Sequence, residues 1–319
     1  MKHLRLFLLL IVSAGVLRAQ PADRYVVIAV IDGARYSETL GDPNHQYIPR
    51  LWNIFRPQGI VYLSFYNNGV TTTTPGHSSI LSGVWQHIAN DGSEPPHTPT
   101  VFEYYRKALG RPAEDVQIIL GKKKLAVLAA SDFAGYGNPY AATVNRVDGS
   151  FNYNDSAAAD NARRVILSKH PRISIINFPE TDNAAHQGDK PWYLKSIHGA
   201  DSLIVDLWER IQADSVLHGK TILFVTDDHG RHLDGVKNGF IDHGDSCEGC
   251  RHIMCIAAGP DIPPGTVENT MWEQIDLAPT IGALLNFPLP YARGRVMRWA
   301  AEKHAAQGSK PQQSVHHDN

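Results

Sequence analysis

Residues 25–33 read YVVIAVIDG, an apolar run rich in β-branched side chains that ends at the acidic residue Asp32. A strand that is apolar on both sides is typical of the centre of a parallel sheet, because helices cover both of its faces. Four other short runs have the same character, at residues 116–120, 173–178, 221–226 and 253–258. The chain is therefore expected to build its core around a central parallel sheet.

Helical patterns alternate with these runs. Thr98-Pro99-Thr100 is typical of a helix start, and Gly110 is typical of the end of a helix through VFEYYRKAL. Other helical patterns cover residues 155–169, 200–213 and 275–285. This alternation predicts an α/β fold with a mostly parallel central sheet and helices on both faces. We expect a single domain of this kind over residues 21–300.

Acidic residues follow three of the expected strands. Asp32 directly follows the first strand, Asp182 lies shortly after another, and Asp228 follows a third within two residues. In open α/β sheets, ligands bind at the carboxyl ends of the strands. Segments far apart in the sequence are therefore expected to deliver their side chains to one edge of the sheet.

Five motifs carry the candidate chemistry. They are Asp32 in VVIAVIDG, Thr71–His77 as TTTTPGH, Asp182 and His186 in PETDNAAH, Asp228 and His229 in TDDHG, and His243 in DHGD. Each motif alone most often marks a helix cap or a turn. Together they offer three Asp and three His, which make two three-ligand sites of a kind that suits zinc. Two such ions close together form a clamp for in-line displacement at phosphorus.

The order Asp, Thr-x-Pro-x-His, Asp-x-x-x-His, Asp-His, His-Gly resembles the alkaline-phosphatase superfamily. More narrowly, it resembles the type I phosphodiesterase and nucleotide pyrophosphatase branch, which uses a threonine nucleophile. The resemblance runs from Asp32 to about Pro260 and extends weakly to IDLAPTIGALL at residues 275–285. It implies that one zinc ion is held by Asp182, His186 and His243. It implies that a second zinc ion is held by Asp32, Asp228 and His229.

The resemblance also implies that Thr73, two residues before Pro75, is the nucleophile; the residues alone do not distinguish it within Thr71–Thr74. A neutral hydroxyl is a weak nucleophile at neutral pH, and metal coordination activates it. If Pro75 starts a helix through HSSILSG, the helix N-terminus also favours negative charge on a nearby phosphoryl group. The alternative is a Thr-rich loop that caps this helix.

Two further polar residues lie close to the nucleophile motif. Asn90, in HIANDG, matches the Asn that the family places on a non-bridging phosphate oxygen, and a turn Asn before Asp91 is the alternative. His77 is interpreted as structural, because the resemblance gives it no ligand role.

Competing ligands lie near the later motifs. Asp227 either competes with Asp228 or supports a ligand histidine. His232 and His252 are close enough in sequence to compete with His243, although the His-Gly context favours His243.

Basic residues near the motifs have two possible roles, contact with the substrate or solvated surface. Arg35 and the run Lys122-Lys123-Lys124 are candidates for contact with an anionic substrate, but a lysine run is usually solvated surface. We expect the solvated state for this run. The segment from about residue 94 to residue 154 is expected to carry the specificity elements.

The N-terminus reads as an export signal. Lys2 and Arg5 precede the apolar residues 6–17, which predicts a signal peptide over residues 1–20 and a periplasmic or secreted protein; an uncleaved anchor is the alternative. Cleavage removes Lys2, Arg5 and Arg18, so the formal charge moves from −2 to −5. An acidic body argues against nucleic-acid polymers as partners, whereas bound metals still permit a small phosphorylated substrate. No membrane span is expected after cleavage.

An exported chain meets an oxidising compartment. Cys247 and Cys250 are therefore expected to close a small surface disulfide, whereas Cys255, in the apolar run HIMCIAA, is expected to be a buried free thiol. Residues 301–319 are polar and read as a disordered tail.

These patterns predict an exported two-zinc hydrolase of phosphoric esters that acts through a phospho-threonine at Thr73. Phosphodiesters and nucleotide pyrophosphates rank first as substrates, and phosphomonoesters rank second. A sulfatase ranks lower because residues 73–77 lack the Cys or Ser and the Arg of the C/S-x-P-x-R pattern. A cofactor-independent phosphoglycerate mutase is disfavoured by the signal and the missing Ser. The alternative from another class is a non-catalytic metal-binding protein, which the complete ligand set disfavours. No pattern indicates the oligomeric state.

Overall fold

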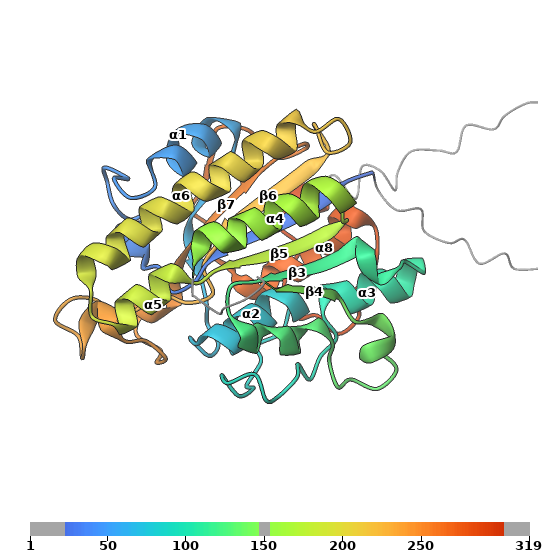
Figure 1. The fold of residues 1–319 in the computed structure, drawn as a ribbon, viewed down its shortest axis with the longest axis horizontal. Helices are drawn as coiled ribbons and strands as arrows, with labels where there is room; N and C mark the ends of the chain where they lie inside the picture. The colour runs from blue at the N-terminus through green and yellow to red at the C-terminus, as the bar shows by residue number, and fades with distance from the viewer. Residues whose placement is uncertain (1–22, 147–153, 303–319) are drawn as a thin grey trace, which may run out of the picture.

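The centre of the protein is one β-sheet (Figure 1). The structure is a computed structural model and describes residues 23–146 and 154–302. Within them the strands are β1 Tyr25–Ile31, β2 Gly59–Tyr66, β3 Val116–Leu120, β4 Thr143–Arg146, β5 Ile173–Phe178, β6 Thr221–Thr226, β7 His252–Ala258, β8 Thr266–Glu268 and β9 Trp272–Glu273. Their order across the sheet is β4-β3-β5-β1-β6-β7-β2-β8, and β9 pairs with β2.

The predicted mostly parallel sheet is confirmed. β1 pairs in parallel with β5 and β6, and β3 pairs in parallel with β4 and β5. β2 is likewise parallel to β8 and β9. The exception is β7, which runs antiparallel to both β6 and β2.

Helices cover both faces of the sheet, as predicted. The helices are α1 Pro49–Gln58, α2 Thr73–Ser82, α3 Val101–Leu109, α4 Asp155–Lys169, α5 Glu180–His186, α6 Lys190–Ala213, α7 Glu248–Arg251 and α8 Leu277–Leu285. Short 3₁₀ turns occur at Tyr36–Glu38, Ala113–Asp115, Lys123–Ala129, Asn138–Tyr140, Gly239–Ile241 and Gln274–Asp276. Helices α1, α4 and α6 lie on one face, and α2, α3 and α8 lie on the other (Figure 1).

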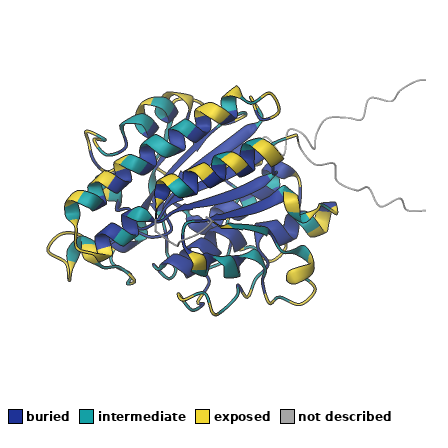
Figure 2. Ribbon diagram, viewed as in Figure 1, coloured by how far each residue is buried: buried dark blue, intermediate teal, exposed yellow. Residues whose placement is uncertain are grey.

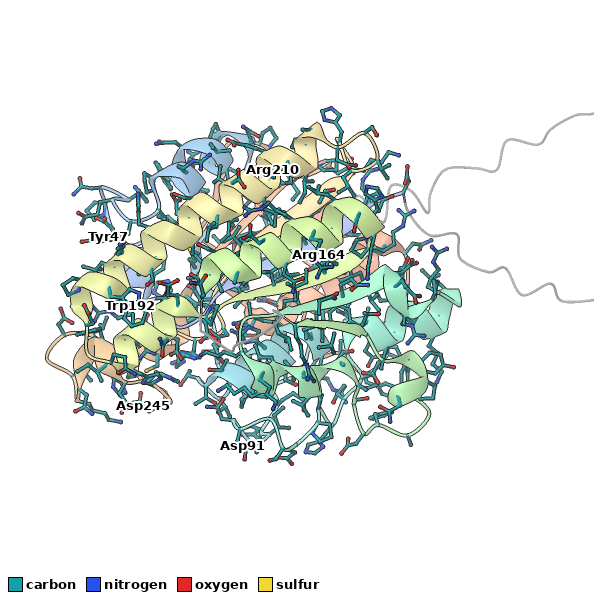
Figure 3. The ribbon with its side chains drawn as sticks, viewed as in Figure 1. Tyr47, Asp91, Arg164, Trp192, Arg210 and Asp245 are labelled. Carbon is teal, nitrogen blue, oxygen red and sulfur yellow. The ribbon has the colours of Figure 1, made fainter. Side chains whose placement is uncertain are left out.

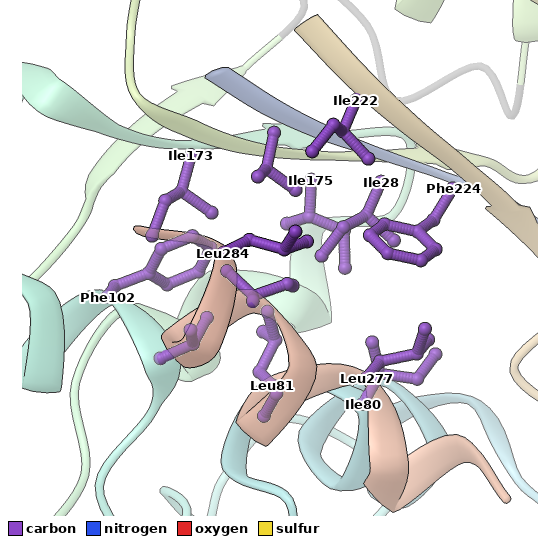
Figure 4. Packing of buried hydrophobic residues seen from close by; sticks show 14 of the residues in the cluster. Ile28, Ile80, Leu81, Phe102, Ile173, Ile175, Ile222, Phe224, Leu277 and Leu284 are labelled. Atoms are coloured by element: carbon purple, nitrogen blue, oxygen red, sulfur yellow. The ribbon is translucent and has the colours of Figure 1, made fainter. Parts of the chain in front are cut away.

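The first strand shows why both faces need cover. Ile28 packs in the core layer beneath α2, α3 and α8, whereas its neighbours Val27 and Ala29 pack in the opposite layer. Figure 4 shows Ile28 facing a layer that includes Ile80 of α2 and Leu277 of α8. Burying each such aliphatic side chain stabilises the fold by roughly 1.5–3 kcal/mol. The central strands are accordingly buried, whereas the edge strands β4 and β8 are only partly buried, and the helices expose their outer sides (Figure 2).

Most predicted elements are confirmed. The first four predicted strands have the bounds expected from the sequence, and β7 begins one residue earlier, at His252. Thr100 and Glu103 form a reciprocal capping box at the start of α3, and Gly110 ends the helix with φ 63°. The sequence did not predict β2, β4, β8, β9 or α1. The helix predicted from residue 200 begins ten residues earlier, at Lys190 of α6.

The two predicted terminal segments fall mostly outside the described residues. The predicted signal peptide, residues 1–20, lies wholly outside them, and so do residues 303–319 of the predicted tail. Ala301 and Glu302, at the predicted start of the tail, are helical. Among the described residues, no helix has the length and apolar character needed to cross a membrane.

Candidate active site

Neighbouring strands deliver polar side chains to one edge of the sheet. Asp32 directly follows β1, Asp182 follows β5 as part of α5, and Asp228 follows β6. Since β5, β1 and β6 are adjacent and parallel, their carboxyl ends lie together. The structure therefore brings the sequence motifs to one place.

Asp182, His186 and His243 form a first group of candidate metal ligands. His186 Nε2 lies 3.1 Å from His243 Nε2 and 3.3 Å from Asp182 Oδ1. His243 Nε2 lies 3.5 Å from the same carboxylate oxygen. Helix α5 places Asp182 and His186 on one face, four residues apart, and the loop between β6 and β7 brings His243 to them.

Asp32, Asp228 and His229 form a second group, and all three are fully buried. His229 Nε2 lies 3.5 Å from Asp228 Oδ2 and 3.8 Å from Asp32 Oδ1. Neither His229 Nε2 nor Asp228 Oδ2 has a hydrogen-bond partner among the described residues. Buried polar atoms without partners are costly. A cation between them removes this cost, so the donor set fits a divalent metal ion.

His229 contacts both groups. Its ring stacks on the ring of His243, with centroids 3.8 Å apart. Ligand atoms of Asp182, His229 and His243 all lie within 4.8 Å of one another, and the same holds for Asp32, His77 and Asp228. The two groups therefore adjoin, with His229 close to the first group and His77 close to the second.

Burial keeps the histidines in the form that binds metals. Burial and the nearby His243 hold the pKa of His229 well below its usual range. Burial and Arg231 lower the pKa of His243 to about 4. Burial alone would raise the pKa of Asp182, but Lys122, His186 and Arg231 together outweigh burial and hold that pKa well below its usual range. Neutral imidazoles beside a carboxylate are suitable ligands for zinc-class ions.

Thr73 is the first residue of α2 and is buried. The helix starts two residues earlier than the sequence indicated, so the Thr73 hydroxyl lies at the helix N-terminus itself. Gly76 in the same motif is in close contact with the second group, since a Cβ on Gly76 would lie 2.5 Å from the Asp228 carbonyl oxygen. The Pro-Gly-His sequence thus lets α2 pack directly against a ligand-bearing loop.

Lys122, which the sequence named as a candidate for substrate contact but placed in solvent, is buried in the site. Its Nζ lies 2.8 Å from Asp32 Oδ1, 2.5 Å from Asp182 Oδ2 and 3.4 Å from Thr73 Oγ1. Burial lowers its pKa, but three carboxylates, including Asp228, outweigh burial and raise the pKa above its usual range. The predicted solvated state is therefore wrong for this lysine. A signal was available, because Lys122 follows β3 by two residues and β3 lies beside β5.

A cavity of about 810 Å³ opens beside Thr73. Its lining includes Lys122, Lys124, Arg146 and His243. Asn90 also lines it, on the loop next to Asp91 (Figure 3). Residues between 94 and 154 therefore supply one wall, and the basic side chains make it suitable for an anion.

Asn90 holds the nucleophile loop. Its Oδ1 accepts hydrogen bonds from the backbone N–H of Thr74, at 2.9 Å, and from Lys124 Nζ, at 3.0 Å. The Thr74 hydroxyl in turn donates to the Asn90 carbonyl, at 2.9 Å. Asn90 thus has a structural bond to Thr74 and also borders the cavity.

The remaining candidates are accounted for. His77 Nδ1 donates to the Thr73 carbonyl at 2.9 Å and lies 3.2 Å from Asp228 Oδ2, so His77 contacts the second group of candidate ligands. The Asp227 Oδ2 atom accepts from the Met254 N–H at 3.0 Å, and no hydrogen bond joins this carboxylate to a candidate ligand histidine among the described residues. The ring of His252 stacks on Tyr36, away from the site.

Two further expectations are not met. Arg35 is buried and ion-paired with Glu38 and Asp234, so it does not face the cavity. All three cysteines are free thiols, so the expected disulfide between Cys247 and Cys250 is not formed. Cys255 is fully buried, as expected.

Supporting residues fix the ligands in place, and sequence reasoning did not identify them. Asn177 Nδ2 donates to Asp32 Oδ2 at 2.8 Å. Arg231 is fully buried, contacts the Asp182 carboxylate and donates through Nε to the Gly33 carbonyl at 3.1 Å. Gln274 Nε2 donates to the Asp228 carbonyl at 2.5 Å.

Comparisons with known proteins support the relationship that the motifs indicated. The family model of the metalloenzyme superfamily matches residues 133–253. The catalytic subunit of GPI ethanolamine phosphate transferase 3 from Mus musculus is 28% identical over 163 residues. That match covers 46% of this chain and only 13% of the mouse protein.

Solved structures share the fold. Murine ectonucleotide pyrophosphatase/phosphodiesterase 5 superposes with a TM-score of 0.64 at 14% identity, covering 85% of this chain and 97% of that chain. A protein in the alkaline phosphatase superfamily from Vibrio parahaemolyticus superposes with a TM-score of 0.62 at 14% identity. The match covers 87% of this chain and 71% of that chain. The fold that the resemblance implied is confirmed: the chain has the fold of the alkaline phosphatase superfamily, and residues 133–253 match the metalloenzyme-superfamily model.

Proposed function

We propose that the protein hydrolyses phosphoric esters, with phosphodiesters or nucleotide pyrophosphates as substrates and Thr73 as the nucleophile. The observation that carries this proposal is the position of the Thr73 hydroxyl. It lies at the N-terminus of α2, 3.4 Å from Lys122 Nζ, where two groups of candidate metal ligands adjoin. A phosphoryl group in the neighbouring cavity would meet a nucleophile and a concentration of positive charge together.

Two zinc ions are the cofactors that we propose. The first would be held by Asp182, His186 and His243. The second would be held by Asp32, Asp228 and His229. When bound, the ions would lower the pKa of coordinated hydroxyl groups and neutralise phosphate charge.

The side chains of this chain would perform the remaining steps. The Thr73 hydroxyl gives its proton to solvent, and Oγ1 forms a bond to phosphorus as the bond to the leaving oxygen breaks and that oxygen takes up a proton. Water then cleaves the phospho-threonine: its oxygen bonds to phosphorus, and one of its protons goes to Oγ1. Lys122 holds a positive charge beside the reacting oxygen, and the positive end of the α2 dipole favours the charge that develops on phosphate. Lys124 and Arg146 would contact the outer part of the substrate.

A comparison of bis-(p-nitrophenyl) phosphate with p-nitrophenyl phosphate tests the proposal. We expect the zinc-loaded protein to hydrolyse the diester faster than the monoester. No turnover of either ester in the presence of zinc would leave the non-catalytic alternative, a metal-binding protein on this fold.

A phosphomonoesterase is the second candidate. Lys124 and Arg146 line the cavity together with Lys122, and a monoester dianion carries one more negative charge than a diester. A preference for the monoester in the same assay would support this candidate.

We also propose that the protein acts in the periplasm or outside the cell, after removal of residues 1–20, on a small phosphorylated substrate. The support is the apolar run at residues 6–17 behind Lys2 and Arg5. The formal charge of −5 after removal of residues 1–20 argues against nucleic-acid polymers as partners.

A further inference from the structure

Another group of metal-binding side chains lies outside the candidate active site. His232, Asp245, Cys247 and Cys250, here called the Cys–His cluster, each offer one ligand atom, and these four atoms all lie within 4.8 Å of one another. All four belong to the loop between β6 and β7, and Asp245 marks the surface side of this loop in Figure 3. We propose that the Cys–His cluster binds one structural zinc ion.

The donor types favour zinc. Two thiolates, one imidazole and one carboxylate make four donors, which is the number in a closed tetrahedral zinc site. Sulfur donors also select zinc-class ions over magnesium and calcium. The spacing Cys247-x-x-Cys250 is the common one for zinc-binding turns, and the Cys247 carbonyl accepts from the Cys250 N–H at 3.1 Å, which closes the turn.

His232 supplies an independent observation. Its side chain is 3% exposed, its Nε2 lies 3.1 Å from Asp245 Oδ2, and its Nδ1 has no hydrogen-bond partner among the described residues. A buried imidazole with an unpartnered nitrogen beside two thiols is costly without a ligand. Asp245 also forms an ion pair with the exposed Lys237. This ion pair provides a partner for the Asp245 carboxylate but none for Cys247 or Cys250.

The backbone holds the donors together. The Gly230 N–H donates to the Cys250 carbonyl at 2.8 Å, and a Cβ on Gly230 would lie 2.1 Å from the Gly249 carbonyl oxygen. Only glycine permits this approach, which brings the segment of His232 against the cysteine turn. The cluster is thus prearranged by the fold.

The zinc ion would stabilise the loop that carries His243. The Thr71 hydroxyl donates to the Asp245 carbonyl at 2.8 Å, and His243 Nδ1 donates to the Thr71 carbonyl at 2.9 Å. Asp245 and His243 are therefore tied through one threonine next to the nucleophile motif. The structural role does not depend on which ester the active site hydrolyses.

Zinc stoichiometry tests the proposal. The wild type, the Cys247→Ser/Cys250→Ser double variant and Cys255→Ala are loaded with Zn²⁺, washed and measured by native mass spectrometry. Cys255 is the matched control, because it is a free thiol outside the cluster. We expect the double variant to bind one zinc ion fewer than the wild type, and Cys255→Ala to bind the same number. The test compares the number of bound zinc ions in the wild type with that in the double variant. An active site that binds no zinc would lower both numbers equally and would leave this difference unchanged.

Cobalt gives a second readout that does not require a folded variant. Co²⁺ bound by thiolates produces a sulfur-to-metal charge-transfer band in the near ultraviolet, whereas the oxygen and nitrogen donors of the active site do not. We expect this band in the wild type and its loss when Zn²⁺ is added in excess. Absence of the band, equal zinc content in wild type and double variant, or a wild-type mass lower by two hydrogens from a Cys247–Cys250 disulfide would each overturn the proposal.

Discussion

Lys122 and Asp182 form a buried ion pair in which Nζ lies 2.5 Å from Oδ2. The same ammonium group lies 2.8 Å from Asp32 Oδ1, so one cation joins the two groups of candidate ligands. Two carboxylates from different strands would repel each other strongly at this depth without it. This relationship makes Lys122 both a stabilising and a reactive element of the site.

Lys122→Met is expected to lower turnover of a nitrophenyl phosphate ester by roughly 10²–10³-fold, because the positive charge beside Thr73 Oγ1 is lost. Steady-state kinetics on zinc-loaded protein measures the effect. Lys195→Met, on the exposed side of α6, is the matched control and should keep near-normal kinetics. Turnover of Lys122→Met equal to that of the control would show that Lys122 has no part in the reaction.

Thr73→Ala should lower turnover by roughly 10⁴–10⁶-fold while zinc content and folding survive, because it removes the nucleophile and none of the six proposed ligands. Thr73→Ser keeps the oxygen and should retain measurable activity. Thr72→Ala is the better control, since Thr72 makes no side-chain cap bond to α2, whereas the Thr71 hydroxyl donates to Asp245.

The same reasoning predicts a covalent intermediate on Thr73. Acid quenching of the wild type during turnover should trap phosphate or a phosphodiester on the peptide that contains residues 71–77. A label found on another peptide would assign the nucleophile elsewhere.

Metal removal should abolish activity, and zinc should restore it. After dialysis against a chelator, zinc is added back in steps, and atomic absorption measures the bound zinc at each step. Activity should return as the active-site ligands bind zinc again. Full activity of a metal-free sample would refute the two-zinc mechanism.

The metal-free protein should lose stability as pH falls from about 6.5 to about 4. Burial and Arg231 lower the pKa of His243 from 6.5 to about 4, so the unfolded state binds a proton in this window that the folded state does not. The unfolding free energy should therefore fall with decreasing pH by roughly 3 kcal/mol from this residue. Chemical denaturation across the window measures it, and His243→Asn should show a flatter dependence.

The mature chain should begin near Gln20 or Pro21. The apolar run at residues 6–17 behind Lys2 and Arg5 motivates this expectation. Mass spectrometry of protein from a periplasmic or secreted fraction measures the mature N-terminus. An intact Met1 in a cytoplasmic fraction is the contrary result.

The central strands were readable because both of their faces are buried, which leaves an uninterrupted apolar run such as β1. β2 lies at the outer side of the sheet, and its residues Leu63 and Ser64 are only partly buried, so its pattern is less distinct. Helix α6 was truncated because Pro191 and Gly199 interrupt the pattern. Pro191, however, lies in the first turn, where a missing N–H costs nothing.

The candidate ligands were readable because carboxylates and imidazoles after strands point to one edge of the sheet. The burial of Lys122 was harder to predict, because a lysine run has the same appearance whether it faces solvent or a buried carboxylate pair, and only its position two residues after β3 pointed to the site. His232 and the cysteines were read separately, as a competing ligand and a disulfide. The backbone contact between Gly230 and Cys250 that joins them has no signature in local sequence.

The reversed direction of β7 has a consequence for how such a site can change. A strand parallel to β6 would need a crossover that returns the chain to the opposite edge of the sheet. Because β7 is antiparallel, residues 227–251 leave and re-enter at the same edge, as a long hairpin connection. Insertions or deletions in this hairpin can reshape the mouth of the site while the pairing of Leu223 with Ala258 stays in register.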